Sequence, residues 1–164
     1  MSRNHLSVVR DADRELRAET VVEAPMEAVW AALTDLRRMP EWSPELVAMR
    51  PLKRGGLRLG QWYLGINRKG WAVWPTRSVV TQLEPTSTLA RHTATSGATW
   101  VYELTSERAG AATRVVQRRP VPRLTWISWI YAPLMLGGGP AHADALEQDM
   151  GVTLARLKAA VEGR

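Results

Sequence analysis

The sequence contains no cysteine and no phenylalanine, and only three histidines. Without cysteine, the chain has neither a disulfide framework nor thiolate chemistry. His5, His92 and His142 lie far apart and lack the paired spacing of metal ligands. The glycine triplet before Pro140 lacks the GK[ST] ending of a phosphate-binding loop. We therefore predict no metal, no cofactor and no assignable catalytic residue.

Long hydrophobic runs are also missing. The most apolar stretch, from Leu124 to Leu136, has about thirteen residues and is interrupted by Pro133, whereas a membrane-spanning helix needs roughly 20. The first residues lack the apolar core and cleavage site of a signal peptide. These features predict a cytoplasmic protein, and they leave peripheral contact with a membrane open.

The charge is basic but dispersed. Lysine and arginine total 22 against 16 acidic residues, a net charge of +6. A basic net charge favours binding to anionic partners. The arginines form no block, however, so we do not expect a nucleic-acid partner and keep an anionic membrane as an alternative. With 164 residues, of which 45% are hydrophobic, the chain predicts a flexible arm over residues 1–15 and a single domain over residues 16–164.

Hydrophobic periodicity outlines the elements. Alternation from Leu16 predicts a half-buried strand. The segment APMEAVWAALTD, with Pro25 in its first turn, predicts a short amphipathic helix, and LRRMPEW predicts a second. Residues 46–117 contain short β-branched and aromatic runs separated by turn residues, which indicates about six antiparallel strands. Residues 141–164 form a long helix with one apolar stripe.

Such a sheet has one apolar face that needs a cover, and the terminal helix is the only element long enough to provide it. The predicted fold is therefore α+β, with a curved antiparallel sheet wrapped around the long C-terminal helix and two short helices after the first strand.

This layout resembles the START-related superfamily of polyketide cyclases and lipid-transfer proteins, which has the helix-grip fold. The resemblance rests on the order of APMEAVWAALTD, MPEWSPE, GQWYLGINRKGW, TRSVVTQLEP, TWVYEL with TRVVQ, and MGVTLARLKAAVE. It implies a deep apolar cavity between sheet and helix, and ligands such as lipids, quinones, polyketides or hormones. Some members cyclise polyketides and others bind a protein or the ribosome, and no cofactor is common to them.

The residues themselves favour a cavity. One face of the predicted strands mixes large aromatic with small polar side chains, whereas a solid core would use closely matched aliphatic ones. Gly151 in the final helix costs up to about 1 kcal/mol relative to alanine, and we expect it to leave room. The predicted cavity residues are Trp30, Trp42, Tyr63, Asn67, Trp74, Thr76, Val80, Trp100, Tyr102, Gln117, Met150, Gly151 and Leu154.

Polar candidates for chemistry are few. Strand alternation turns Asn67, Tyr102 and Gln117 inward, where they can orient a carbonyl or hydroxyl group without titrating near neutral pH. His92 is the candidate that could titrate there, although an exposed strand histidine fits it too. We favour binding of a hydrophobic small molecule (a lipid, isoprenoid or polyketide) over catalysis. The alternatives are a polyketide cyclase or dehydratase, and a ribosome- or partner-binding module.

The apolar segment PRLTWISWIYAPLMLGGGP, residues 122–140, has three interpretations. It can form a flap over the cavity that hinges on its glycines, dock on an anionic membrane, or pack in a homodimer interface or in the core. Trp62, Leu64 and Ile66 fall on the outward strand face, which lends weight to a dimer, so monomer and homodimer both stay open. The residues predicted to form the flap are Trp126, Trp129, Ile130, Tyr131, Leu134, Met135 and Gly138.

Overall fold

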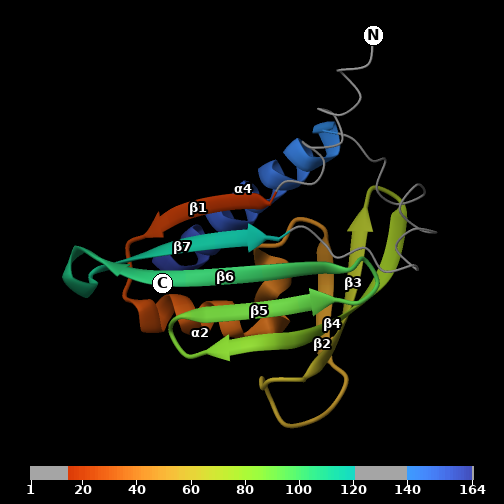
Figure 1. Ribbon diagram of the computed structural model, residues 1–164, viewed down its shortest axis with the longest axis horizontal. Helices are drawn as coiled ribbons and strands as arrows, with labels where there is room; N and C mark the ends of the chain where they lie inside the picture. The colour runs from red at the N-terminus through yellow and green to blue at the C-terminus, as the bar shows by residue number, and fades with distance from the viewer. Residues whose placement is uncertain (1–14, 121–139, 164) are drawn as a thin grey trace.

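A computed structural model describes residues 15–120 and 140–163 (Figure 1). Seven strands form one antiparallel sheet in the order β1-β7-β6-β5-β4-β3-β2. In chain order the elements are β1 (Leu16–Val22), α2 (Met26–Thr34), the 3-10 helix η1 (Leu36–Glu41), β2 (Leu46–Pro51), β3 (Trp62–Lys69), β4 (Ala72–Glu84), β5 (Thr88–Thr93), β6 (Ala98–Glu107), the short 3-10 helix η2 (Arg108–Gly110), β7 (Ala112–Arg119) and α4 (Pro140–Glu162).

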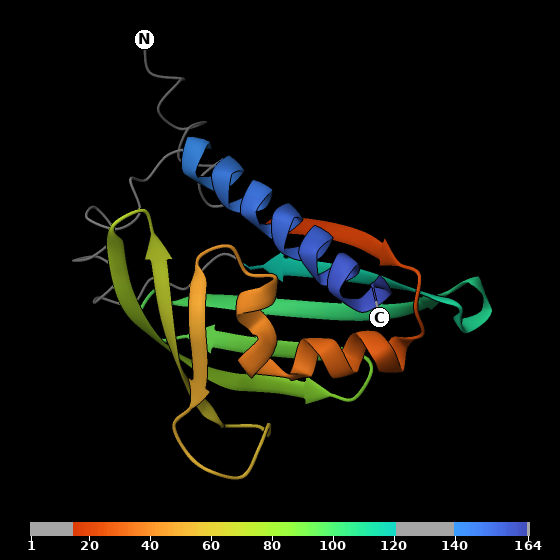
Figure 2. The ribbon, with the colours of Figure 1, turned by 180° about the vertical axis from the view of Figure 1, so that it is seen from behind.

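The helices α2, η1 and α4 lie on one face of this sheet (Figure 2). The sheet curves strongly, since β2 and β3 run steeply across the direction of β6 and β7 in Figure 1. A register shift on β4 between Val80 and Gln82 marks an irregularity in its pairing with β5, and bulges of this kind bend a strand. The curved sheet thus partly encloses the three helices.

The long helix α4 covers the β1 side of the sheet. Its residues Met150, Leu154 and Leu157 are buried, as the predicted apolar stripe requires. Full burial of each such side chain contributes about 1.5–3 kcal/mol. The Nζ atom of Lys158 donates a hydrogen bond to the carbonyl oxygen of Val21, which fastens the end of α4 to β1.

The two short helices close the other side. Val29, Ala32 and Leu33 of α2 are buried, as is Leu36 of η1. Pro40 lies inside η1, and because proline lacks the backbone donor of a regular helix it keeps this element short. The next segment enters β2, which packs against η1.

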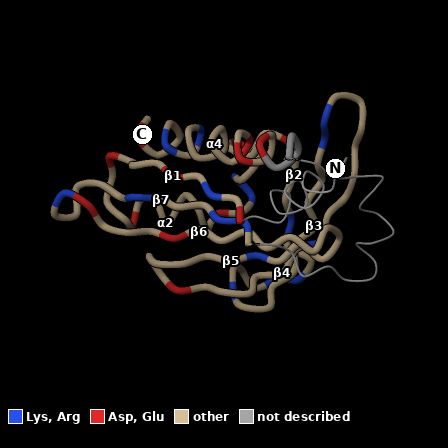
Figure 3. Tube along the Cα trace, turned by 45° about the horizontal axis from the view of Figure 1, so that its top comes forward, with Lys and Arg blue, Asp and Glu red and all other residues tan. Residues whose placement is uncertain are grey.

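Charges of both signs are interspersed along β1, β6 and β7 (Figure 3). Arg114 on β7 forms an ion pair with Glu19 on β1 at 2.9 Å, and Arg118 forms one with Glu15 at 2.9 Å. These pairs are partly exposed, so each contributes little to stability. They nevertheless account for several of the dispersed arginines as neighbours of acidic side chains.

The predicted fold is confirmed, including the curved antiparallel sheet, the two short helices after the first strand and the long C-terminal helix. The predicted N-terminal arm lies outside the described residues except for Glu15, so it stays a prediction. Within residues 15–120 and 140–163, none of the helices has the length and apolarity needed to cross a membrane.

Candidate functional site

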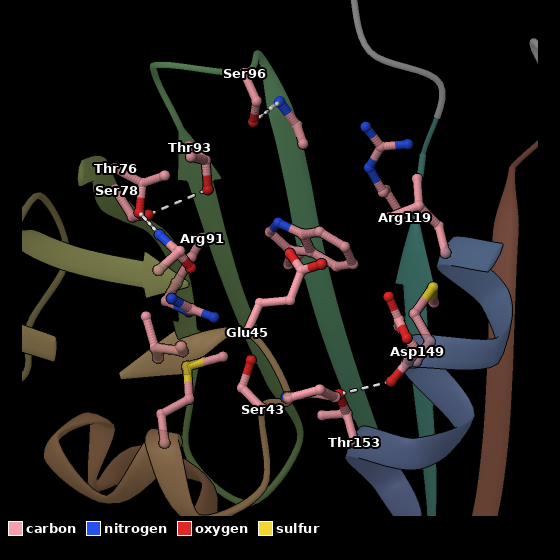
Figure 4. Close-up of a pocket in the computed structure, with 18 of the residues that line it drawn as sticks. Ser43, Glu45, Thr76, Ser78, Arg91, Thr93, Ser96, Arg119, Asp149 and Thr153 are labelled. Carbon is pink, nitrogen blue, oxygen red and sulfur yellow. Dashed lines mark hydrogen bonds between the residues drawn. The ribbon is translucent and has the colours of Figure 1, made fainter. Parts of the chain in front are cut away.

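A pocket of about 350 Å³ lies between the sheet and α4 (Figure 4). Strands β3 to β7 form one wall, and the segment from η1 into β2 forms another. Ala145, Leu146, Asp149, Met150 and Thr153 of α4 form the opposite wall. The volume falls in the lower part of the range of small-molecule sites.

One part of the sheet wall carries hydroxyl and amide groups. The side-chain amide of Asn67 donates a hydrogen bond to the hydroxyl of Thr76 at 3.0 Å. The hydroxyls of Ser78 and Thr93 are 3.1 Å apart and form a buried hydrogen bond between β4 and β5. Each polar group therefore already has one partner, and each hydroxyl can still accept or donate another hydrogen bond to a ligand.

Another part of the pocket is apolar. Trp100 and Ala98 contribute from β6, and Leu146 and Met150 from α4. The guanidinium carbon of Arg119 lies 5.6 Å from the ring centre of Trp100, a cation–π arrangement. Burial lowers the pKa of Arg119. A pocket with apolar parts and hydroxyl groups fits a ligand that is mostly hydrocarbon with some oxygen atoms.

A buried polar cluster lies on β5, β6 and β7. Gln117 donates a hydrogen bond from its side-chain amide to the hydroxyl of Tyr102 at 3.1 Å. The guanidinium of Arg91, a residue only 4% exposed, lies near the same hydroxyl. Burial raises the pKa of Tyr102, and the nearby Arg91 opposes that rise. Burial likewise lowers the pKa of Arg91.

Further charged groups line the pocket. The Nζ atom of Lys69 lies 2.8 Å from a carboxylate oxygen of Glu45, and this hydrogen bond raises the pKa of Lys69. Asp149 projects from α4, on the opposite side of the pocket from Arg91 (Figure 4). The described residues contain no cluster of three or more histidine, aspartate or glutamate side chains arranged to hold a metal ion.

The structure brings part of the predicted cavity set together. The predicted residues that line the pocket are Asn67, Trp74, Thr76, Trp100, Tyr102, Gln117 and Met150. They lie on the inner face of the sheet or on α4, where these elements border the pocket.

The other predicted cavity residues lie elsewhere. Trp42, Tyr63, Val80 and Leu154 are buried in the main hydrophobic core, and Trp30 packs against it. They face inward, as strand and helix periodicity indicates, but other side chains of the core fill the space around them.

The expectation for Gly151 is wrong. This residue is exposed, and a Cβ atom placed on it would meet nothing within 4 Å. Its missing side chain therefore makes no room in the pocket. Gly65 on β3 is instead closely packed, because a Cβ there would lie 2.7 Å from Thr76 Oγ1 and 3.2 Å from Leu46 Cδ1, two residues that do line the pocket.

The predicted cavity set leaves out most lining residues, among them Arg91, Thr93 and Arg119. Alternation along β5 was the available signal for the first two, because Leu89, Arg91 and Thr93 share a face and all three are buried. His92, the predicted titratable group, points to the other face of β5. Its Nδ1 atom lies 3.1 Å from the hydroxyl of Thr99, so it takes no part in the pocket.

The predicted flap residues, from Trp126 to Gly138, lie outside the described residues. Trp62, Leu64 and Ile66, predicted to face outward, are half-buried. The guanidinium carbon of Arg77 lies 5.1 Å from the ring centre of Trp62. The side chain of Arg77 thus stacks on Trp62, the largest of these three residues.

One protein family and several solved structures match this chain. The family model described as polyketide cyclase / dehydrase and lipid transport matches residues 13–162. No curated protein sequence matches the chain significantly. Among solved structures, the Zhui aromatase/cyclase from Streptomyces sp. R1128 is 19% identical, with a TM-score of 0.66 over 92% of this chain and 94% of that one.

Two further structures show the same fold. The protein TTHA0849 from Thermus thermophilus is 16% identical, with a TM-score of 0.65 over 92% of this chain and 98% of that one. The di-domain aromatase/cyclase StfQ of the steffimycin pathway is 17% identical, with a TM-score of 0.64 over 95% of this chain and 53% of that one. At these identities the likeness establishes the fold alone.

Proposed function

The chain belongs to the polyketide cyclase / dehydrase and lipid transport family, and we propose that it binds a hydrophobic small molecule in the pocket between the sheet and α4. The observation that carries this proposal is the pocket itself, about 350 Å³ with an apolar wall and a hydroxyl-bearing wall. Water against Trp100, Ala98 and Met150 is unfavourable, and a ligand that replaces it gains about 25 cal/mol for each Å² of apolar surface buried.

The lining supports a ligand that is mostly hydrocarbon and carries oxygen atoms, such as a lipid, an isoprenoid or a polyketide. Asn67, Thr76, Ser78 and Thr93 offer polar groups to such oxygen atoms. Histidine is absent from the described pocket lining, and His92 points to the other face of β5. A general acid or base poised near neutral pH, as efficient proton transfer needs, is therefore not supplied by histidine there. This favours binding over turnover.

Two alanines on α4 allow a matched test. Ala145 and Ala155 are both exposed, but only Ala145 is among the residues that line the pocket. We expect Ala145→Trp to obstruct the pocket and to abolish binding of fatty acids and planar aromatic ligands, measured by calorimetry and by native mass spectrometry of the purified protein. Ala155→Trp should bind as the wild type does. Failure of the wild type to bind any ligand of either class would contradict the proposal.

A second candidate function is a polyketide cyclase or dehydratase, which one observation favours. Arg91 and Tyr102 place a cation and a neutral hydroxyl side by side in the pocket lining, and such a pair can stabilise an enolate oxygen. Two neighbours in fold are named as aromatase/cyclases. The test is incubation with a poly-β-keto thioester analogue, with aromatic product followed by absorbance. Turnover that Tyr102→Phe abolishes while binding persists would establish catalysis, and binding without turnover by the wild type would exclude it for that substrate.

A further inference from the structure

Among the residues that the structure describes, Arg91 is a buried cation without an anionic partner. Its Nη1 atom contacts the sulfur of Met49 at 3.6 Å, and its Nε atom has no hydrogen-bond partner in the described ranges 15–120 and 140–163. A thioether is a weak acceptor, and a guanidinium carries five N–H donors. Within the described part of the chain, no hydrogen bond or ion pair joins Arg91 to a carboxylate.

Tyr102 does not supply the missing negative charge. Its hydroxyl lies near Arg91 and accepts a hydrogen bond from Gln117. Burial raises the pKa of Tyr102, so this hydroxyl stays protonated and neutral at physiological pH. Arg91 itself stays charged although burial lowers its pKa, because a guanidinium is not deprotonated in proteins. The net charge of this pair is therefore positive.

The other charged groups of the pocket do not neutralise it either. Glu45 is bound to Lys69 at 2.8 Å. Asp149 projects from α4 on the far side of the pocket from Arg91 (Figure 4). Arg119, over the ring of Trp100, adds a second cation. Since Glu45 is paired with Lys69 and Asp149 lies across the pocket, the charge of Arg91 is not neutralised by either carboxylate of the lining.

A buried charge without a partner costs several kcal/mol, and an anionic ligand removes that cost. Carboxylate matches the planar guanidinium best, because it accepts two parallel hydrogen bonds from it. We propose that the ligand of this pocket carries a carboxylate held by Arg91, with its apolar body against Trp100 and Met150. This inference rests on the proposed function, since it names the class of ligand for the same pocket.

The experiment compares two ligands of nearly equal shape, naphthoate and its neutral amide, naphthamide. Calorimetry at neutral pH would give the affinity of each for the wild type, Arg91→Met and Arg119→Met. We expect the wild type to bind naphthoate at least about tenfold more tightly than naphthamide, a difference of ~1.4 kcal/mol. Arg91→Met should lose this preference and keep its affinity for naphthamide. Arg119→Met should keep the preference.

A second measurement separates recognition from structural support. Methionine fills a similar volume without charge, so Arg91→Met without ligand should unfold at a temperature no lower than that of the wild type. Equal wild-type affinities for the two ligands would overturn the inference while leaving the proposed function intact. Loss of the preference in Arg119→Met alone would move the anion site to Arg119. If neither ligand binds the wild type, the proposed function fails for this class and the inference fails with it.

Discussion

Gln117 on β7 is paired with Tyr102 on the adjacent strand β6, and its side-chain amide donates a hydrogen bond to the tyrosine hydroxyl at 3.1 Å. Arg91 on β5 lies near the same hydroxyl and opposes the rise in its pKa. Side chains that line the pocket therefore cluster on three adjacent strands. The hydroxyl of Tyr102 lies at the centre of this cluster. A substitution at Tyr102 therefore tests how much the cluster contributes to stability.

Tyr102→Phe should lower the free energy of unfolding by about 1–3 kcal/mol, because the amide of Gln117 loses its buried hydrogen-bond partner. Urea denaturation followed by tryptophan fluorescence measures this change. The matched control is Tyr63→Phe. The described structure records no hydrogen bond from the Tyr63 hydroxyl, so its removal should cost less than about 1 kcal/mol. Equal losses in both variants would contradict the organising role of Tyr102.

Gly151→Ala should stabilise the protein by up to about 1 kcal/mol, because alanine favours a helix more than glycine does. Space allows the change, since nothing lies within 4 Å of the new Cβ. Gly65→Ala should instead destabilise the protein and weaken ligand binding, because its Cβ would lie 2.7 Å from Thr76 Oγ1 at the pocket wall. Thermal unfolding and calorimetry measure the two effects. Stabilisation by both substitutions would show that the close contact at Gly65 relaxes freely.

Glu162 ties the end of α4 to the end of β1. Its carboxylate accepts the backbone N–H of Glu23 at 2.6 Å and pairs with Lys158 at 3.0 Å. These contacts hold the pKa of Glu162 below its ordinary value of 4.5, and the hydrogen bond from the backbone of Glu23 has the largest effect. A lowered native pKa means that the stabilisation is present above the unfolded pKa and is lost as the pH falls through the native one.

Glu162→Gln should therefore be less stable than the wild type at neutral pH, and the gap should close as the pH falls below about 4. Chemical denaturation at several pH values measures it. Glu27→Gln serves as the control, because Glu27 is exposed on α2 and its carboxylate has no hydrogen bond to the part of the chain that the structure describes. A gap that persists unchanged into acid would show that charge on Glu162 is not its source.

Two tryptophans sit in opposite environments. Trp42 is 1% exposed in the main core, whereas Trp71, between β3 and β4, is 96% exposed. Trp42→Ala should cost about 3–5 kcal/mol, as truncation of a large core residue does. Trp71→Ala should change the free energy of unfolding by less than about 0.5 kcal/mol, as surface substitutions do. A large loss from Trp71→Ala would reveal packing that its exposure does not show.

Much of the fold could be read from periodicity. Alternation along β1 places Leu16 and Val22 on the buried face, and the stripe on α4 identifies Met150, Leu154 and Leu157. The strand punctuation between residues 46 and 117 also predicts the six strands from β2 to β7. These patterns are local, since each depends only on which residues share a side of one element.

The candidate site was less accessible. Alternation assigns Tyr63, Val80 and Asn67 to the inner face alike, yet only Asn67 lines the pocket. Arginine is mostly found on protein surfaces, so its charge argues against burial of Arg91. Alternation with Leu89 nevertheless indicates a buried position.

The chain pattern by itself determined the elements, their order and the side that each strand turns to the interior, because these follow from residue spacing. Only the tertiary structure decided where that interior is filled and where it is open. The position of η1 and α4 over the curved sheet leaves space beside Asn67 and Arg91 and none beside Val80. Such a difference arises from packing between distant segments, and no local pattern encodes it.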